Sequence, residues 1–434
     1  MAVTALTLSL FILILLGLPI SFSLGISSIV YFIFNPDFLI IMPQRMWAGA
    51  NSSVMVALPL FCMAGMLMNC SGITQKIIDF CSYLVKPFKG GLGEVNVIAS
   101  MIFGGISGSS VSDTSALGSV LIPEMEKRGY SKAFATGITV GSSTVGMIIP
   151  PSIPMIIYST ISNESVGALF LAGLIPGILI GLTQLILVYI ISRHNDYPIE
   201  EGKFEIREMM KRSIDGILSI SMPLFIVFIG FQLPSGLLLS FGVATATESA
   251  GIAVTYAVII GFLVYRKLKL EQFKEVAKET LFTSSTIMII ISFAYIFIWI
   301  LAFERIPDII GNFILSLDVS YFWILLFLDI LILLVGMFID VSPALLLLGP
   351  ILVPVMETLG MDLLQLGAIL IVGLGIGLAT PPIGMCLNAA SKISDMPIMD
   401  IAKETLPFLL CNVLVLVLVT FVPQISLWIP SLFF

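Results

Sequence analysis

Long apolar runs recur from one end of the chain to the other, and they restrict the fold more than any other feature. A helix crosses the hydrocarbon core of a bilayer in roughly 20 residues, and most of these runs have that length. Only 11% of the residues are charged, whereas soluble domains carry roughly 25%. The sequence therefore predicts an all-α polytopic membrane protein, with its main apolar runs at 3–18, 166–192, 214–231, 249–265, 286–303 and 406–422.

The polar residues argue against several classes of protein. The charged residues lie mainly in short connectors, so the net charge of −7 does not indicate nucleic acid binding. The run that starts at Met1 fits a first span better than a signal peptide, because no small-residue cleavage site ends it. The cysteines are odd in number and lack paired spacing, which argues against a disulfide framework or a zinc site. We expect them to be small apolar fillers: Cys62, Cys70, Cys81, Cys386 and Cys411.

Some connectors alternate charged with apolar residues, as helices lying in the membrane interface do. Basic residues occur in connectors on both sides of the predicted crossings, so the sequence leaves the side of each terminus open. The expected interfacial segments are 72–89, 201–215, 267–280 and 304–318.

An internal repeat changes the interpretation more than any local motif. A constant offset places Gly105 on Gly336 (336 − 105 = 231) and keeps many further prolines, glycines and one glutamate in register without a gap. The matched pairs indicate a duplication. They are Pro123 with Pro354, Glu126 with Glu357, Gly129 with Gly360, Gly146 with Gly377, Pro150 and Pro151 with Pro381 and Pro382, and Pro176 with Pro407.

Each copy contains a polar interruption that predicts a re-entrant hairpin, within 94–127 and within 321–358. The run GGISGSSVSDTS at 104–115 separates flanks that we expect to be too short to span about 30 Å at about 1.5 Å per residue. Crossings between the copies then number five, an odd count that inverts the second copy. These crossings are 132–161, 166–192, 214–232, 236–265 and 281–303.

A proline-rich break follows each hairpin, at 141–154 and 373–382. Proline removes amide donors and frees upstream carbonyl groups, which are ligands for a hard cation. Irregular backbone at membrane depth is tolerated where protein buries it or where it lines a wet cavity. The alternative is that these small residues only permit close helix packing. The expected sodium ligands are Gly105, Ser107, Ser109, Ser110, Gly146 and Ile149 in one site, and Gly336, Asp340, Gly377 and Thr380 in the other.

Acidic residues within apolar stretches are functional candidates, because a carboxylate at membrane depth is expensive. Asp113 and Asp340 lie at or beside the tips, although Asp113 also fits a helix cap. For Glu248 and Asp329 we favour structural hydrogen bonding over proton carriage. Amides at half-helix starts attract anions, so we place a carboxylate or sulfonate substrate between the sodium sites. Its candidate contacts are Ser110, Asp113, Ser143, Pro151, Ser342 and Pro382.

Two motifs resemble catalytic or nucleotide-binding signatures but lack their partners. The sequence from Gly105 to Gly108 matches the serine motif of rhomboid proteases, which needs a histidine base. The sole histidine, His194, lies in a polar connector. The glycines at 373–377 lack the third glycine and the βαβ context of a dinucleotide loop. We therefore expect no enzyme and no cofactor, and an ion gradient as the driving force, with a separate ATPase subunit as an alternative.

Four stretches resemble the large membrane subunit of tripartite ATP-independent periplasmic (TRAP) transporters, and the match runs along nearly the whole chain. They lie at 103–130, 148–158, 336–354 and 377–388. The resemblance implies an elevator mechanism, in which a transport domain carrying both hairpins slides against a scaffold, coupled to sodium entry. It also implies two partners, a small membrane subunit of four helices and a periplasmic substrate-binding protein. At matching positions the family's sodium sites fall on the tips and breaks already named.

The expected architecture contains about ten to eleven transmembrane helices plus two re-entrant hairpins in an inverted repeat. We expect sodium-coupled import of a small organic anion, such as sialic acid, a C4-dicarboxylate or a sulfonate, across the bacterial inner membrane. The alternatives are a proton-coupled or channel-like permease, or the membrane subunit of an ATP-driven transporter. The expected units are 1–90 and 193–320 for scaffold helices, 91–192 and 321–403 for the two transport repeats, and 404–434 for a C-terminal helix.

Overall fold

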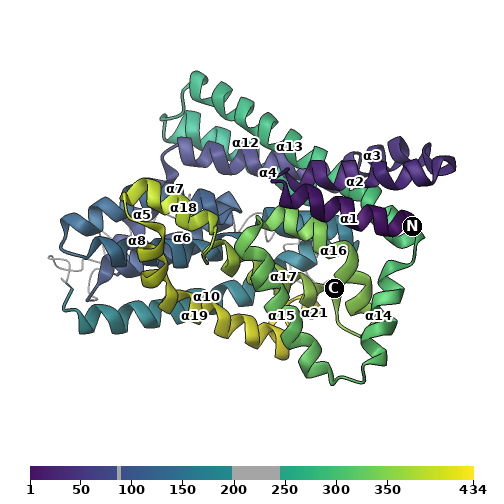
Figure 1. Cartoon of the computed structure of the whole chain (residues 1–434). Helices are drawn as coiled ribbons and strands as arrows, with labels where there is room; N and C mark the ends of the chain where they lie inside the picture. The colour runs from purple at the N-terminus through teal and green to yellow at the C-terminus, as the bar shows by residue number, and fades with distance from the viewer. Residues whose placement is uncertain (86–88, 198–244) are drawn as a thin grey trace.

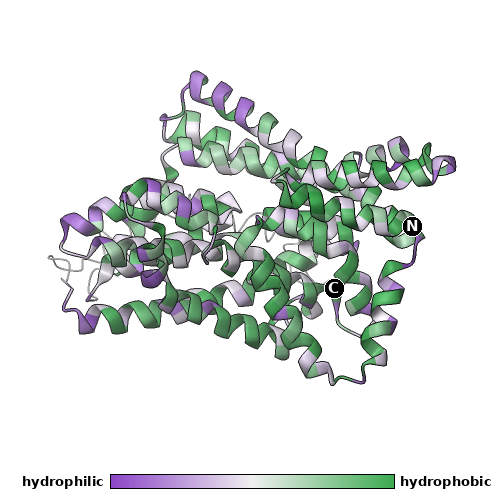
Figure 2. Cartoon of the chain, viewed as in Figure 1, coloured by the Kyte–Doolittle hydropathy of each residue, from purple (hydrophilic) through white to green (hydrophobic). Residues whose placement is uncertain are grey.

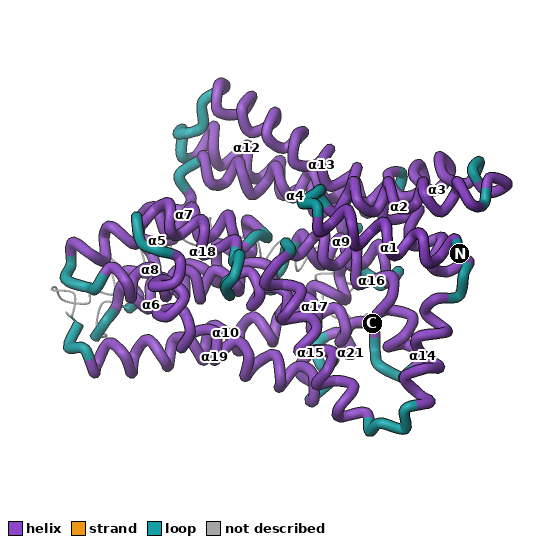
Figure 3. The backbone as a smooth tube through the Cα atoms, in the orientation of Figure 1, coloured by secondary structure: helices purple, strands orange, loops and turns teal. Residues whose placement is uncertain are grey.

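The computed structural model describes residues 1–85, 89–197 and 245–434, and these residues fold almost entirely into helices (Figure 3). Within this part of the chain, six helices are long and apolar enough to cross a membrane, and a bent pair adds a seventh. Hydrophobic residues cover most of their length (Figure 2). The predicted crossing at 214–232, the interfacial segment at 201–215 and the start of the crossing at 236–265 lie outside the described residues.

One layer of helices contains segments from both halves of the chain (Figure 1). It comprises α1 (Ala2–Leu15), α2 (Ile20–Phe34), α3 (Ile41–Ala50), α4 (Ser53–Cys70), α12 (Ala246–Ile259) and α13 (Leu270–Phe303). Helix α4 packs on α12, and α13 packs against α2, α3 and α4. The expected interfacial helix at 267–280 is wrong, because α13 runs unbroken for 34 residues through this segment.

The remaining helices form two sets with the same order of elements. The first contains α5 (Ile73–Leu84), α6 (Gly91–Ser107), α7 (Ser110–Lys127), α8 (Lys132–Ser143), the 3₁₀ turn η2 (Thr144–Met147), α9 (Ile153–Ser162) and α10 (Val166–His194). The second contains α14 (Ile306–Ser316), α15 (Tyr321–Phe338), α16 (Val341–Thr358), α17 (Leu363–Leu378), α18 (Met385–Ser394) and α19 (Ile398–Phe421), followed by the short helices α20 (Gln424–Leu427) and α21 (Pro430–Phe433).

The helix boundaries confirm the internal duplication. Helix α16 begins and ends 231 residues after α7 (341 − 110 and 358 − 127), and α17 spans the positions that match α8 together with η2. The correspondence extends upstream of the predicted repeats, because α14 follows α5 and α12 follows α2 at nearly the same offset. The two sets also interlock, since α9 packs on α16 of the second set and α18 packs on α7 of the first.

The two hairpins open toward opposite ends of α10. At its C-terminal end, Lys89 before α6 pairs with Asp196, and Tyr130 after α7 stacks on Tyr197 with ring centroids 4.6 Å apart. At its N-terminal end, Glu164 lies in the electrostatic field of Asp362 and Glu357, which flank the turn after α16. Each hairpin therefore enters from its own end of the bundle.

The hairpin arms are longer than the sequence suggested. Helices α6 and α7 have 17 and 18 residues, which corresponds to about 26 and 27 Å at about 1.5 Å per residue. The polar run at 104–115 belongs mostly to these helices, with only Gly108 and Ser109 between them. The flanks are thus not too short to approach the thickness of a bilayer, and the length argument for re-entrance fails. Re-entrance itself stays a prediction.

Candidate functional site

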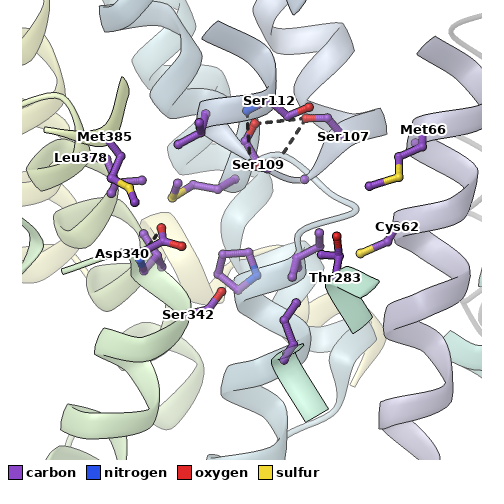
Figure 4. Close-up of a pocket in the computed structure, with 18 of the residues that line it drawn as sticks. Cys62, Met66, Ser107, Ser109, Ser112, Thr283, Asp340, Ser342, Leu378 and Met385 are labelled. Carbon is purple, nitrogen blue, oxygen red and sulfur yellow. Dashed lines mark hydrogen bonds between the residues drawn. The ribbon is translucent and has the colours of Figure 1, made fainter. Parts of the chain in front are cut away.

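A cavity of about 350 Å³ lies where the two hairpin tips meet the layer that contains α4 and α13. Figure 4 shows Ser107, Ser109 and Ser112 of the first hairpin on one side, and Asp340 and Ser342 of the second on another. Both breaks contribute to the wall, through Met147, Ile153, Pro154, Leu378 and Met385. The cavity therefore joins all four polar interruptions that the sequence singled out.

The first tip is a two-residue turn between α6 and α7. Gly108 has φ +61°, a left-handed conformation that glycine adopts without steric cost. Ser109 caps α7, and its hydroxyl accepts from the Ser112 amide at 3.5 Å. The alternative that Asp113 caps this helix is wrong, because Ser109 occupies the cap position and Asp113 lies one turn inside the helix.

Asp113 lies behind the tip rather than on the cavity wall. Its side chain is completely buried, and its Oδ1 accepts a hydrogen bond from the Ser107 hydroxyl. The other oxygen, Oδ2, has no hydrogen-bond partner among the described residues, and neither does the buried Ser110 Oγ. Asp113 Oδ2 faces the close contact between Gly104 of α6 and Gly146 of η2, where a Cβ on Gly146 would lie 1.9 Å from it.

The second tip carries its acid at a different position. Asp340 caps α16, and its carboxylate accepts from the Val341 amide at 2.8 Å. The two caps correspond in the repeat, since Ser109 matches Asp340 (340 − 109 = 231), whereas Asp113 matches Ala344. Each tip therefore has one carboxylate, enclosed in the first repeat and facing the cavity in the second (Figure 4).

Each hairpin touches the break of its own repeat at glycines. A Cβ on Gly377 would lie 2.3 Å from the Gly336 carbonyl carbon. In the first repeat the contact with Gly146 is made by Gly104, one residue before the predicted Gly105. Both breaks contain a cis peptide bond, Pro150–Pro151 and Pro381–Pro382. The predicted pairing of hairpin and break is therefore present in both copies.

The predicted site residues divide between the cavity wall and the protein behind it. Ser107, Ser109, Asp340 and Ser342 line the cavity. The structure places the others off its wall: Gly105, Ser110, Asp113, Ser143, Gly146, Ile149, Pro151, Gly336, Gly377, Thr380 and Pro382. Among these, Ser143 accepts from Thr114 Oγ1 at 2.7 Å, Thr380 donates to the Ile376 carbonyl at 2.8 Å, and Pro382 is exposed.

The opposite wall was missed by sequence reasoning. Cys62, Met66 and Asn69 of α4 and Thr283 of α13 line the cavity. No local motif marks them, and they lie far from the hairpins in the sequence. The interpretation of all cysteines as fillers fails for Cys70, which is exposed, and is incomplete for Cys62, which is buried but contributes to the cavity wall.

The two additional acids make structural hydrogen bonds, as we favoured. Glu248 closes a capping box with Thr245 at the start of α12, with the Thr245 amide 2.6 Å from its carboxylate. Asp329 of α15 accepts from Thr420 Oγ1 at 2.9 Å. Its second oxygen has no hydrogen-bond partner among the described residues.

Comparison with known proteins agrees with this architecture. The chain is 36% identical to the sialic acid TRAP transporter large permease protein SiaM of Vibrio cholerae, over 96% of both chains. It is 33% identical to the C4-dicarboxylate TRAP transporter large permease protein DctM of Pseudomonas aeruginosa, over 94% of both. The fold resembles the YdaH transporter of Alcanivorax borkumensis, with a TM-score of 0.60 at 14% identity, covering 90% of this chain and 87% of that one.

The family "Tripartite ATP-independent periplasmic transporter, DctM component" matches residues 7–425, which is nearly the whole chain. The match includes both hairpins, both breaks and the α4 and α13 wall of the cavity. The chain therefore belongs to the tripartite ATP-independent periplasmic transporter family, as a large membrane permease component and a multi-pass membrane protein.

Proposed function

We propose that this chain imports a small organic anion by sodium-coupled secondary transport, after a periplasmic binding protein delivers the substrate. Similar permeases are named for sialic acid and for C4-dicarboxylates, so the substrate class is a carboxylate or a chemically related sulfonate. The observation that carries the proposal is the cavity between the two hairpin tips, with the enclosed Asp113 carboxylate directly behind it.

Sodium is the coupling ion in this proposal because the tip carboxylates need a cation. An ionised carboxylate without a counter-charge is costly to bury, yet Asp113 Oδ2 and Ser110 Oγ have no hydrogen-bond partner in the described part of the chain. Carboxylate, hydroxyl and carbonyl oxygens are the ligands that hard cations prefer. We therefore move Asp113 from the substrate contacts to the first cation site, with Ser110 and the carbonyls near Gly146.

The cavity favours a substrate that arrives together with cations. Its described lining contains hydroxyl groups and one acid, Asp340, but no lysine or arginine. An anion beside an unneutralised Asp340 would be repelled, because like charges repel strongly where water is sparse. A sodium ion at Asp340 removes this repulsion and leaves Ser107, Ser109 and Ser342 as hydrogen-bond donors to the anion. The anion and sodium then bind cooperatively.

The charge distribution supports one orientation in the bacterial inner membrane. Basic residues gather at the C-terminal end of α10, where Lys89 pairs with Asp196 and the turn with Lys127, Arg128 and Lys132 leads to Tyr130. Acidic residues gather at its N-terminal end, namely Glu164, Glu357 and Asp362. Short cytoplasmic loops carry an excess of lysine and arginine, so we assign the C-terminal end of α10 to the cytoplasm.

An elevator movement accounts for how the site changes sides. The layer of α4 and α13 would act as scaffold, and the hairpins, breaks, α10 and α19 as the moving transport domain. A second hollow shares Met66 and Thr283 with the cavity and continues along the charged first half of α13, past Glu275 and Lys278. We take this hollow as the route to the cytoplasmic side. The exposed apolar faces would contact lipid and a small four-helix partner subunit.

Uptake into proteoliposomes tests the proposal. The chain is reconstituted with its small subunit, and radiolabelled sialic acid or a C4-dicarboxylate is supplied on its binding protein under an imposed sodium gradient. We expect uptake that requires both sodium and the binding protein. Uptake driven equally by a proton gradient, or only by ATP, would replace this proposal by one of the alternatives, and passive flux at equal sodium concentrations would indicate a channel.

A further inference from the structure

Four groups behind the first break form a closed ring of hydrogen bonds between three helices. Gln184 of α10 donates to the Gly141 carbonyl at 2.9 Å and to Asn412 Oδ1 at 2.7 Å. Asn412 of α19 donates to Thr144 Oγ1 at 2.9 Å. Thr144 donates in turn to the Gly141 carbonyl at 2.8 Å, which closes the ring. We call these residues the amide ring.

The amide ring costs free energy that an apolar contact would not. Gln184 and Asn412 have no exposed surface, and burying an amide is unfavourable unless it is hydrogen-bonded. The other copy of the repeat manages without it, because Gln184 matches Val415 (415 − 184 = 231) and Asn412 matches Gly181. Helix packing alone therefore does not require these side chains.

The ring holds the segment that forms both the cation site and the cavity wall. Thr144 is the first residue of η2, whose third residue, Gly146, faces Asp113 Oδ2. The last residue of η2, Met147, lines the cavity. Helix α19 approaches closely here, since a Cβ on Gly141 would lie 2.4 Å from Phe408 Cβ, one turn before Asn412. Through the ring, α10 and α19 of different repeats fix one turn of backbone.

We propose that Gln184 and Asn412 are positioning residues for the first cation site, acting through Thr144 on the η2 turn. This inference rests on the proposed sodium coupling. If the ring is opened, η2 loses the side-chain contact that fixes it relative to α19. The carbonyl groups near Gly146 then no longer converge on Asp113, and the site binds sodium more weakly in an otherwise folded protein.

The sharpest variant pair is Thr144→Val and Thr144→Ser in the reconstituted complex. Valine keeps the shape of threonine and removes the hydroxyl, whereas serine keeps the hydroxyl. Asn412→Leu opens the same ring from the other side. Gln365→Leu is the matched control, because Gln365 is also a buried amide that bridges to α19, by donating to the Val419 and Thr420 carbonyls at 3.0 Å, but it lies away from the break.

The readout is the sodium concentration that gives half-maximal uptake, together with the thermal stabilisation that sodium gives the purified protein. We expect Thr144→Val and Asn412→Leu to raise that concentration about tenfold, equivalent to ~1.4 kcal/mol, and to weaken the thermal effect to match. Thr144→Ser should behave like the wild type. Gln365→Leu should lower the melting temperature without changing the sodium concentration required.

Two results overturn the inference in different ways. If wild-type uptake ignores sodium, the proposed function fails and the positioning role fails with it. If wild-type uptake needs sodium but Thr144→Val and Asn412→Leu keep its sodium dependence, or Gln365→Leu changes it equally, the ring is only structural. If a variant is unstable in membranes, the sodium-induced thermal shift of Thr144→Val in detergent decides between these outcomes.

Discussion

Replacing Gly146 by alanine tests the contact between the first hairpin and its break. The added Cβ would lie 1.9 Å from Asp113 Oδ2 and 3.3 Å from the Gly104 Cα. Ordinary contacts begin near 3.4 Å, so the carboxylate or η2 must shift by 3.4 − 1.9 = 1.5 Å. Asp113 has little room to retreat, because it is fully buried and its Oδ1 is held by Ser107.

Overpacking of this kind costs about 1–3 kcal/mol. If the strain falls on the cation site, apparent sodium affinity drops by roughly 5- to 150-fold, since each 1.4 kcal/mol is a factor of about ten. The assay is sodium-dependent uptake in proteoliposomes, with the amount of folded protein checked by size-exclusion chromatography. Gly311→Ala is the control, because a Cβ there meets nothing within 4 Å. A folded Gly146→Ala protein with wild-type sodium dependence would refute the proposed role of this contact.

Three further changes follow from the same geometry. Asp340→Ala and Ser110→Ala should each lower apparent sodium affinity in uptake assays while the protein stays folded; an unchanged sodium dependence removes that residue from the site. Gly377→Ala should impair uptake, because its Cβ would lie 2.3 Å from the Gly336 carbonyl carbon; full activity would show that the second hairpin tolerates separation from its break. Partial burial and nearby Asp362 and Glu357 raise the pKa of Glu164, so its contribution to stability is present at acidic pH and lost as pH rises through that pKa. Glu164→Gln should flatten the acid side of the melting-temperature profile, and an unaltered profile would contradict this.

The repeat and its hairpins could be predicted from the sequence because their signals are local or periodic. Glycines and prolines kept a constant offset, and the structure reproduces that offset at the ends of α7 and α16. Gly108 and Ser109 mark a turn by their own chemistry, a left-handed backbone and a helix cap. Such features need no knowledge of distant parts of the chain.

The lengths of the helices were harder to predict, because propensity in water is a poor guide within a membrane. Residues 104–107 and 110–115 are rich in glycine and serine yet helical, since any other conformation would leave peptide groups unsatisfied in an apolar environment. The charged segment at 270–279 suggested a separate interfacial helix, but α13 continues through it. Charged residues are compatible with a helix that extends beyond the bilayer.

The far wall of the cavity and the amide ring depend on tertiary contacts that no local pattern reveals. Thr283 reaches the tips through the packing of α13 on α4. Gln184 and Asn412 meet across 228 positions, close to the repeat offset of 231, but each matches an apolar residue or glycine in the other copy. The repeat pattern therefore gave no reason to pair them.

Sodium flux measured alongside substrate flux tests the central claim most directly. In proteoliposomes that contain the permease, its small subunit and the binding protein, ²²Na⁺ and labelled substrate uptake are recorded together at several imposed membrane potentials. The account predicts that substrate drives ²²Na⁺ entry in a fixed ratio, and that Asp340→Ala lowers both fluxes together. Substrate entry without accompanying ²²Na⁺ would contradict it.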